Sequence, residues 1–173
     1  TKKNIAIFSL EMPAEQLIMR MISSLGQIDN KKLSTGKLEN EDWKRFNEAI
    51  SILADTNIYF HDAGGVTPAE IKAKCRRLAT QGDGLGLVII DYLQLIDSSS
   101  RYSGSRQQEV SEISRALKTM ALELEVPVIA LSQLSRSVEK REDKKPVLSD
   151  LRESGSIEQD ADIVAALHAP DVE

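Results

Sequence analysis

The amino-acid sequence predicts an α/β fold with a mostly parallel sheet flanked by helices. Two observations lead to this prediction. Apolar runs of strand length alternate with longer segments whose apolar residues recur every three or four positions, and the strand-like runs are apolar throughout, as in strands buried on both faces. With 173 residues, 41% of them hydrophobic, the chain is long enough to bury one sizeable core. We therefore expect a single domain over residues 1–173.

The first half of the chain contains two expected strands and three expected helices. Residues 5–10 are an apolar run of the kind that fills the middle of a sheet, and a helix over 13–25 follows. A second helix, with Asn40 as its expected cap, places four apolar residues on one face up to Leu53. A brief strand at 58–60 precedes the clearest helix start, at 67–80, which combines a capping box with a proline in the first turn.

The second half continues the alternation. A Gly-rich turn leads into a buried strand at 87–90, which ends on Asp91. A long helix carries one apolar stripe over 110–124, and the next strand is expected at 127–131. These elements extend the predicted sheet by two strands.

The last third is harder to assign. Residues 135–150 are charged and poor in apolar side chains, so we expect a mobile loop. Ser156 and Gln159 fit a capping box for another helix, and an apolar stretch at 163–167 is expected to be the last strand.

Composition excludes several kinds of site. Asp and Glu outnumber Lys and Arg by 27 to 22, so net charge does not indicate nucleic acid, although a local basic groove is compatible with that total. The single cysteine, Cys75, supports neither a disulfide framework nor a thiolate metal site, and its apolar neighbours predict a core position. His61 and His168 are not spaced as a metal pair. No apolar run approaches the ~20 residues that cross a bilayer, which is typical of a soluble, cytosolic protein.

Three polar residues follow the ends of predicted strands, Gln133 with Ser132 between, in the positions where parallel sheets bind ligands. They are Glu11, Asp91 and Gln133. Each alone is typical of a turn or a helix cap. Together they are typical of the polar edge of a nucleoside triphosphatase, in which one acid orients Mg²⁺, a second activates water and an amide senses the terminal phosphate.

Phosphate-binding glycine motifs do not accompany them. No stretch satisfies G-x-x-x-x-G-K-[ST], because Gly36-Lys37 is followed by Leu38 and lacks the earlier glycine. The glycines at 82–86 precede a strand, whereas a dinucleotide fingerprint must follow one. A flexible turn is the better interpretation of these glycines.

Five segments of the sequence together match one family pattern. The segments are SLEM (9–12), IKAKCRRL (71–78), VIIDYLQL (88–95), LSQLSR (131–136) and LRESGSIEQDAD (151–162). They resemble the motor domain of bacterial DnaB-type replicative DNA helicases. The resemblance covers nearly the whole chain, and the last segment is the most specific because twelve consecutive residues match.

The resemblance implies a RecA-like P-loop NTPase core that works in a hexameric ring and binds ATP and Mg²⁺ between subunits. It implies that Glu11 is the catalytic base and that Asp91 is the Walker B acid, which holds Mg²⁺ through water. Gln133 would be the sensor of the terminal phosphate.

The resemblance also implies single-stranded DNA as a partner. Arg152, Glu153 and Gly155 match the family's DNA-contacting loop, and Arg136 lies in a second channel loop. On charge alone, a solvated surface loop and a helix-entry loop capped by Ser156 remain open for these segments. Primase and a helicase loader are expected partners of the complete protein, in the bacterial cytoplasm at the nucleoid.

Two parts of such a motor are not found in the sequence, and the tail at 168–173 departs from the family pattern. The Walker A loop would precede Thr1 and the arginine finger would follow Glu173, so we expect a domain incomplete at both ends and inactive alone. Two alternatives are another RecA-type recombination or repair ATPase and a non-catalytic DNA-binding or oligomerisation domain. The run at 151–162 favours the helicase.

Overall fold

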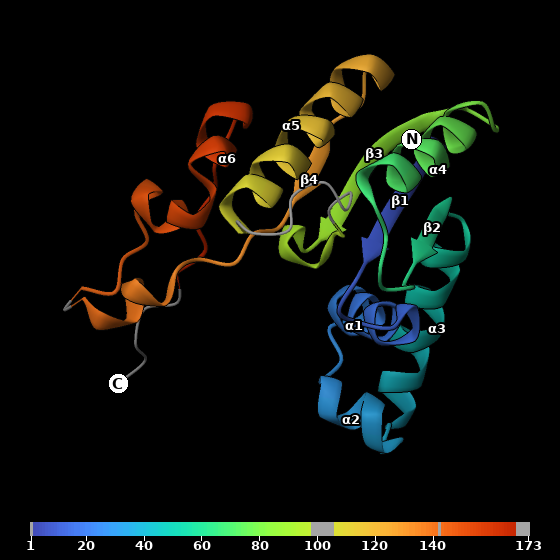
Figure 1. Ribbon diagram of the computed structural model, residues 1–173. Coiled ribbons are helices and arrows are strands. Elements are labelled where there is room, and N and C mark those ends of the chain that lie inside the picture. Colours follow the sequence, from blue (N-terminus) through green and yellow to red (C-terminus); the bar gives the residue numbers. More distant parts are fainter. Residues whose placement is uncertain (1, 98–105, 142, 169–173) are drawn as a thin grey trace.

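The computed structural model describes residues 2–97, 106–141 and 143–168. Its centre is a four-stranded, fully parallel sheet in the order β2-β1-β3-β4 (Figure 1). The α/β class predicted from the sequence is confirmed. The strands are β1 (Asn4–Ser9), β2 (Ile58–His61), β3 (Leu85–Asp91) and β4 (Val128–Ala130).

Helices connect the strands and extend beyond them. Figure 1 shows α1, α2 and α3 grouped near the end of β1, whereas α6 lies beside α5 on the other side of the molecule. The helices are α1 (Ala14–Gly26), α2 (Asn30–Thr35), α3 (Asn40–Ala54), α4 (Pro68–Ala79), α5 (Arg106–Leu124) and α6 (Gly155–Asp160), with short 3₁₀ turns η1 (Leu93–Leu95), η2 (Arg136–Lys140) and η3 (Leu148–Ser154).

The main core lies between one face of the sheet and the helices α4 and α5. Phe8 of β1 and Ile90 of β3 are paired across the strands and point into this core. Ile71 of α4 and Ile113 of α5 meet them there, each no more than 1% exposed. Burial on both faces holds for β1 but not for β4, where Ile129 on the opposite face is 53% exposed. One helix layer therefore provides most of the sheet's buried surface.

Cys75 is part of this core, as predicted. It is completely buried on α4, and burial raises the pKa of its thiol to about 12. A thiol with this pKa stays protonated at neutral pH and is a poor nucleophile.

The helices α1, α2 and α3 have a small core of their own, made of Ile22, Ile28, Leu33 and Ala49. The buried Asp42 links α3 to α2. Its carboxylate accepts hydrogen bonds from Lys32 of α2 at 2.9 Å and from Arg45 of α3 at 2.7 Å. Lys32, followed by the Glu39 main chain, lowers the pKa of the Asp42 carboxyl. This network fixes α2 against α3.

Helix starts explain where the predictions held and where they were wrong. Thr67 and Glu70 form the predicted capping box of α4. Helix α3 is capped by Glu39 and not by Asn40, because Asn40 is already its first helical residue. Helix α2 was not predicted, since its six residues are too few to display helical periodicity.

The last third departs furthest from the predictions. The segment 135–150, expected to be a mobile loop, contains η2 and the start of η3. Ser156 is not a cap: α6 begins at Gly155, so Ser156 lies inside the helix and its hydroxyl is buried without a partner. The stretch 163–167 forms no strand among the described residues, and Ile163 and Leu167 are 86% and 90% exposed. A strand needs a hydrogen-bonded neighbour, and none lies beside this stretch within the described chain.

No helix in the described ranges has the length and apolar character needed to cross a membrane.

Candidate active site at the carboxyl edge of the sheet

Strand register brings the three predicted strand-end residues to one edge of the sheet. Ser9 pairs with Asp91, and the next N–H, that of Leu10, donates to the Asp91 carbonyl at 2.8 Å. Glu11 follows directly. On the other side of β3, the N–H of Leu131 donates to Ile90 at 2.9 Å, and Gln133 follows two residues later. Asp91 ends β3, and Glu11 and Gln133 follow the ends of β1 and β4, the two neighbours of β3 in the sheet.

The turn that carries Glu11 is fixed on both sides of this residue. Ser9 is completely buried, and its hydroxyl donates to the Met12 carbonyl at 2.6 Å. Helix α1 begins just beyond, where the N–H of Ala14 donates to the Asp62 carboxylate at 3.0 Å. The Glu11 side chain itself is exposed. A carboxylate on a fixed backbone with a solvent-facing side chain can receive a proton from a water molecule.

Asp91 ends β3 between these two neighbours and is half-buried. In the described parts of the chain, no three side chains of the His, Cys, Asp and Glu type are grouped as a metal cage. Mg²⁺ in nucleotide sites is held by one or two carboxylates together with substrate phosphates and water, not by an all-protein cage. The carboxylate of Asp91 fits that kind of partial ligand set.

The segment that carries Gln133 is held differently. Gln94, three residues beyond Asp91, donates from its amide to the Ser132 hydroxyl at 3.0 Å and to the Gln133 carbonyl at 3.4 Å. Its amide oxygen accepts the Gln133 N–H at 3.4 Å. The Gln133 side chain is exposed. Sequence reasoning gave Gln94 no role, because its contact partner is 39 positions away and only the strand register brings the two together.

The residues predicted to bind DNA belong to the segments after β4. Arg136 begins η2, Arg152 and Glu153 belong to η3, and Gly155 begins α6. Their side chains lie outside the described part of the structure, so their predicted contacts remain predictions.

The main chain before and after η2 is hydrogen-bonded to Asp150, which is 4% exposed. Its carbonyl accepts the Ser135 N–H at 2.9 Å, and its carboxylate accepts the Val147 N–H at 2.8 Å and a bond from Arg141. The Val147 main chain, followed by Arg141, lowers the pKa of the Asp150 carboxyl. The segment 135–150 is therefore closed at its base, directly before the predicted DNA loop.

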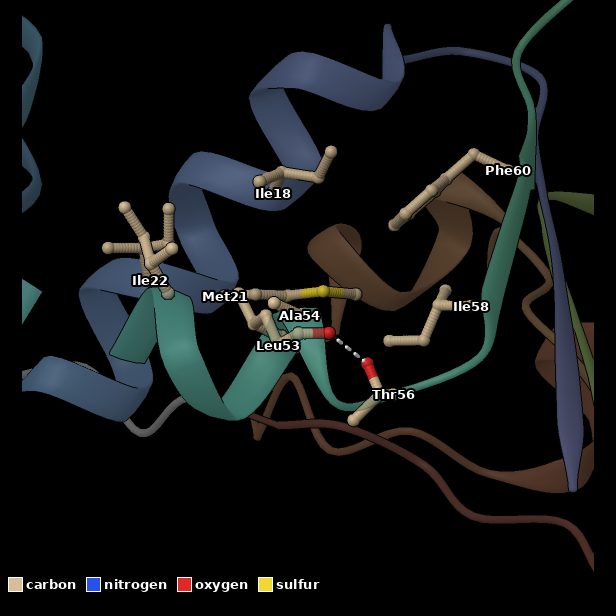
Figure 2. Close-up of a pocket in the computed structure, with 9 residues that line it drawn as sticks. Ile18, Met21, Ile22, Leu53, Ala54, Thr56, Ile58 and Phe60 are labelled. Atoms are coloured by element: carbon tan, nitrogen blue, oxygen red, sulfur yellow. Dashed lines mark hydrogen bonds between the residues drawn. The ribbon is translucent and has the colours of Figure 1, made fainter. Parts of the chain in front are cut away.

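A separate pocket of about 290 Å³ lies between α1, α3 and β2. Figure 2 shows apolar side chains from the three elements, among them Met21, Leu53 and Phe60, facing one another across it. Its polar side chain, Thr56, already donates to the Leu53 carbonyl at 2.6 Å. With no charge and no free donor, this pocket is unsuited to phosphate.

His61 is the last residue of β2. Its ring meets the edge of Phe8, with 5.6 Å between ring centroids. Burial, followed by the positive charge of Lys74, lowers the pKa of His61.

Comparison with known proteins agrees with this geometry. The model of the DnaB-like helicase C terminal domain matches residues 1–173. The chain is 60% identical over 171 residues to the replicative DNA helicase DnaB of Geobacillus stearothermophilus, and 59% identical over 171 residues to the replicative DNA helicase DnaC of Bacillus subtilis. Each match covers 99% of this chain and 37% of the relative, so the chain spans a little over a third of the length of these relatives.

Solved structures show the same fold. A DnaB-like replicative helicase, described with its interactions with primase, superposes with a TM-score of 0.87 at 44% identity, covering 92% of this chain and 39% of that one. A second solved structure, of an ATPase domain, gives the same TM-score and identity, covering 57% of its chain.

The four-stranded parallel sheet, flanked by helices, places this chain in the fold class of these solved helicase and ATPase domains. Within that class, the family match over the whole chain assigns this protein to the DnaB-like helicase C-terminal domain family.

Proposed function

We propose that this chain is the ATP-hydrolysing motor portion of a replicative DNA helicase. The complete protein would unwind duplex DNA at the replication fork as a hexameric ring that moves along single-stranded DNA. It would act in the bacterial cytoplasm, at the nucleoid. The observation that carries the proposal is the register that brings Glu11, Asp91 and Gln133 to one sheet edge, in a chain with 60% identity to a replicative helicase.

Within this proposal each of the three residues has a separate task. Glu11 takes a proton from the attacking water, and the fixed turn keeps its carboxylate in place. Asp91 would hold Mg²⁺ through water, and the ion would supply positive charge beside the phosphates of ATP. Gln133 donates to the terminal phosphate and signals its presence to the segments that follow β4.

The DNA-binding part of the proposal rests on the segments after β4. Arg136 and Arg152 would meet the phosphates of a single strand, and the main chain near Glu153 and Gly155 would add N–H donors. The family run at 151–162 supports this role, as does the closure of the preceding segment at Asp150. No aromatic residue follows Tyr102, so base stacking would not contribute and sequence preference would be weak.

The proposal also covers the partners of the complete protein and the activity of this portion by itself. A second copy of the chain would complete each nucleotide site, and primase and a loader would bind the complete protein. No phosphate-loop sequence occurs in the 173 residues, so this portion by itself would not hydrolyse ATP.

The test is ATP-dependent unwinding of a forked duplex by the full-length protein, compared with its Asp91→Asn variant. We expect Asp91→Asn to lower the unwinding rate roughly 100-fold, because the Mg²⁺ shell loses a charged ligand. Asp83→Asn is the matched control, since Asp83 is an exposed carboxylate at the opposite end of β3.

Unwinding at the wild-type rate by Asp91→Asn would contradict the proposed site. A wild-type protein that hydrolyses ATP on DNA but never separates strands would instead support a recombination-type ATPase.

A further inference from the structure

The side chain of Gln94 continues the sheet past the point where β3 and β4 stop pairing. The last main-chain bonds between the two segments run from Leu131 N–H to Ile90 at 2.9 Å and from Leu93 N–H to Leu131 at 2.9 Å. Beyond them the chain after β3 turns into η1 and leaves the plane of the sheet. The segment after β4 has no main-chain partner from β3 at Gln133.

Gln94 supplies that partner from its side chain. A primary amide carries donors and an acceptor, as a peptide group does. The Gln94 amide bonds both main-chain groups of Gln133, its carbonyl and its N–H, each at 3.4 Å. These are the two groups that a neighbouring strand would pair. A shorter bond of 3.0 Å to the Ser132 hydroxyl fixes the amide in this orientation.

Residues next to Gln94 in the chain are buried in the main core. Its neighbour Leu93 is 3% exposed and Ile96 is 1% exposed, both in the main core. The guanidinium of Arg106, the first residue of α5, donates to the Gln94 carbonyl and pairs with Glu109 at 2.7 Å. The position of Gln94 therefore follows the position of α5.

Helix α5 contacts both Gln94 and the predicted DNA segments. It packs against both η3 and α6, and Leu151 of η3 and Ile157 of α6 belong to the same core cluster as its buried face. Farther along, Lys118 of α5 pairs with Asp162 at 2.6 Å. Gln94 thus lies between Gln133 and the helix that supports the DNA loop.

We propose that Gln94 is a positioning residue that sets the main chain of Gln133 and so couples ATP turnover to DNA binding. Gln94 makes no contact with the reacting atoms in this proposal; it acts through Gln133. The inference rests on the proposed function, because it takes Gln133 as the phosphate sensor. A movement of α5 shifts Gln94, and the Gln133 amide then approaches or leaves the terminal phosphate.

The experiment measures ATP turnover of the full-length protein with and without single-stranded DNA. The variants are Gln94→Ala, Gln133→Ala and the double variant. We expect Gln94→Ala to lower the ratio of DNA-stimulated to DNA-free turnover about fivefold, because it removes the one 3.0 Å bond and the two long 3.4 Å bonds that hold the segment of Gln133. Gln107→Ala, which removes an exposed amide from the first turn of α5, is the control.

The double variant separates positioning from ordinary stabilisation. If Gln94 acts through Gln133, the double variant is no worse than Gln133→Ala alone, because the shared pathway is already broken. Gln94→Glu keeps an acceptor for the Gln133 N–H but faces the Gln133 carbonyl with a negative charge. We expect it to fold and to show a reduced ratio.

The failures are distinguishable. A normal ratio in Gln94→Ala and Gln94→Glu, with a reduced one in Gln133→Ala, overturns the inference and leaves the proposed function standing. If the losses in the turnover ratio of the two single variants add in the double variant, the inference is overturned, and the bonds of Gln94 only stabilise the fold. A normal ratio in Gln133→Ala removes the sensor role from the proposed function, and the role of Gln94 with it.

Discussion

The turns that carry Glu11 and Gln133 leave the same sheet edge but are held in different ways. The Glu11 turn has a buried hydroxyl bond within it and a main-chain bond to β3, at 2.6 and 2.8 Å. The Gln133 segment is exposed and is bonded at that residue by one side-chain amide, at 3.4 Å. A general base needs a fixed position, whereas a sensor must move between two. The difference between the two turns matches the difference between the two proposed tasks.

The largest expected effect is at the fixed turn. Glu11→Gln in the full-length protein should lower DNA-stimulated ATP hydrolysis at least about 100-fold, because the amide cannot accept the proton of the attacking water. Nucleotide affinity, measured with a fluorescent ATP analogue, should stay within about twofold, since the backbone of the turn is unchanged. Exposed Glu48→Gln on α3 serves as the control. Turnover at the wild-type rate would remove Glu11 from the role of base.

The next effect concerns the segments beyond Gln133. Arg152→Ala should weaken binding of single-stranded DNA about tenfold at low salt, and the slope of log affinity against log salt should fall by about 0.7. Fluorescence anisotropy over a salt series measures both. Arg77→Ala on the exposed side of α4 removes the same charge elsewhere. Equal affinity and equal slope in Arg152→Ala would count against the DNA-loop role.

The anchors themselves give a smaller effect. Ser9→Ala should lower the free energy of unfolding by about 1 kcal/mol, because the Met12 carbonyl loses a buried partner. Ser132→Ala should cost less than about 0.5 kcal/mol, since Ser132 is only partly buried and water can replace it. Calorimetry on the full-length variants compares the two. Equal losses of unfolding free energy in the two variants would show that the two turns are held equally firmly, and would contradict the difference between the Glu11 and Gln133 turns.

The last prediction concerns the Asp42 network, which fixes α2 against α3. The folded pKa of Asp42 lies below its ordinary 3.8, so its bonds stabilise the fold at neutral pH and are lost as pH falls through that lower value. Asp42→Asn should therefore be less stable than the wild type at pH 7, and the difference should shrink below about pH 4. A pH series of melting temperatures measures it. A difference independent of pH would assign the effect to packing alone.

Much of the fold was predictable because it follows from local patterns. Thr67 to Glu70 predicted α4 by capping chemistry, and the four-residue apolar run before Asp91 predicted β3. That Glu11, Asp91 and Gln133 lie at one edge of the sheet was predictable for a related reason: in a parallel sheet, strand ends meet at one edge whatever the strand order. Their roles at that edge stay predictions.

What could not be predicted depends on contacts distant in sequence. Gln94 touches Gln133 only because β3 and β4 are adjacent, and no spacing in the sequence states that. Residues 163–167 have a strand-like sequence, but a strand forms only where a neighbour offers its edge. The Ser156 hydroxyl fits a capping box by spacing, but that cap would start the helix at Ile157, whereas α6 starts two residues earlier, at Gly155.

Cys75 gives the molecule a built-in reporter. It is the only thiol in the 173 residues, it is completely buried under the sheet, and its pKa of about 12 keeps it protonated. A thiol reagent can therefore modify this domain only during moments when α4 separates from the strands. The rate of labelling therefore measures how often α4 separates from the sheet. A lower rate after adding nucleotide or DNA would show that the ligand stabilises the packing of α4 on the sheet.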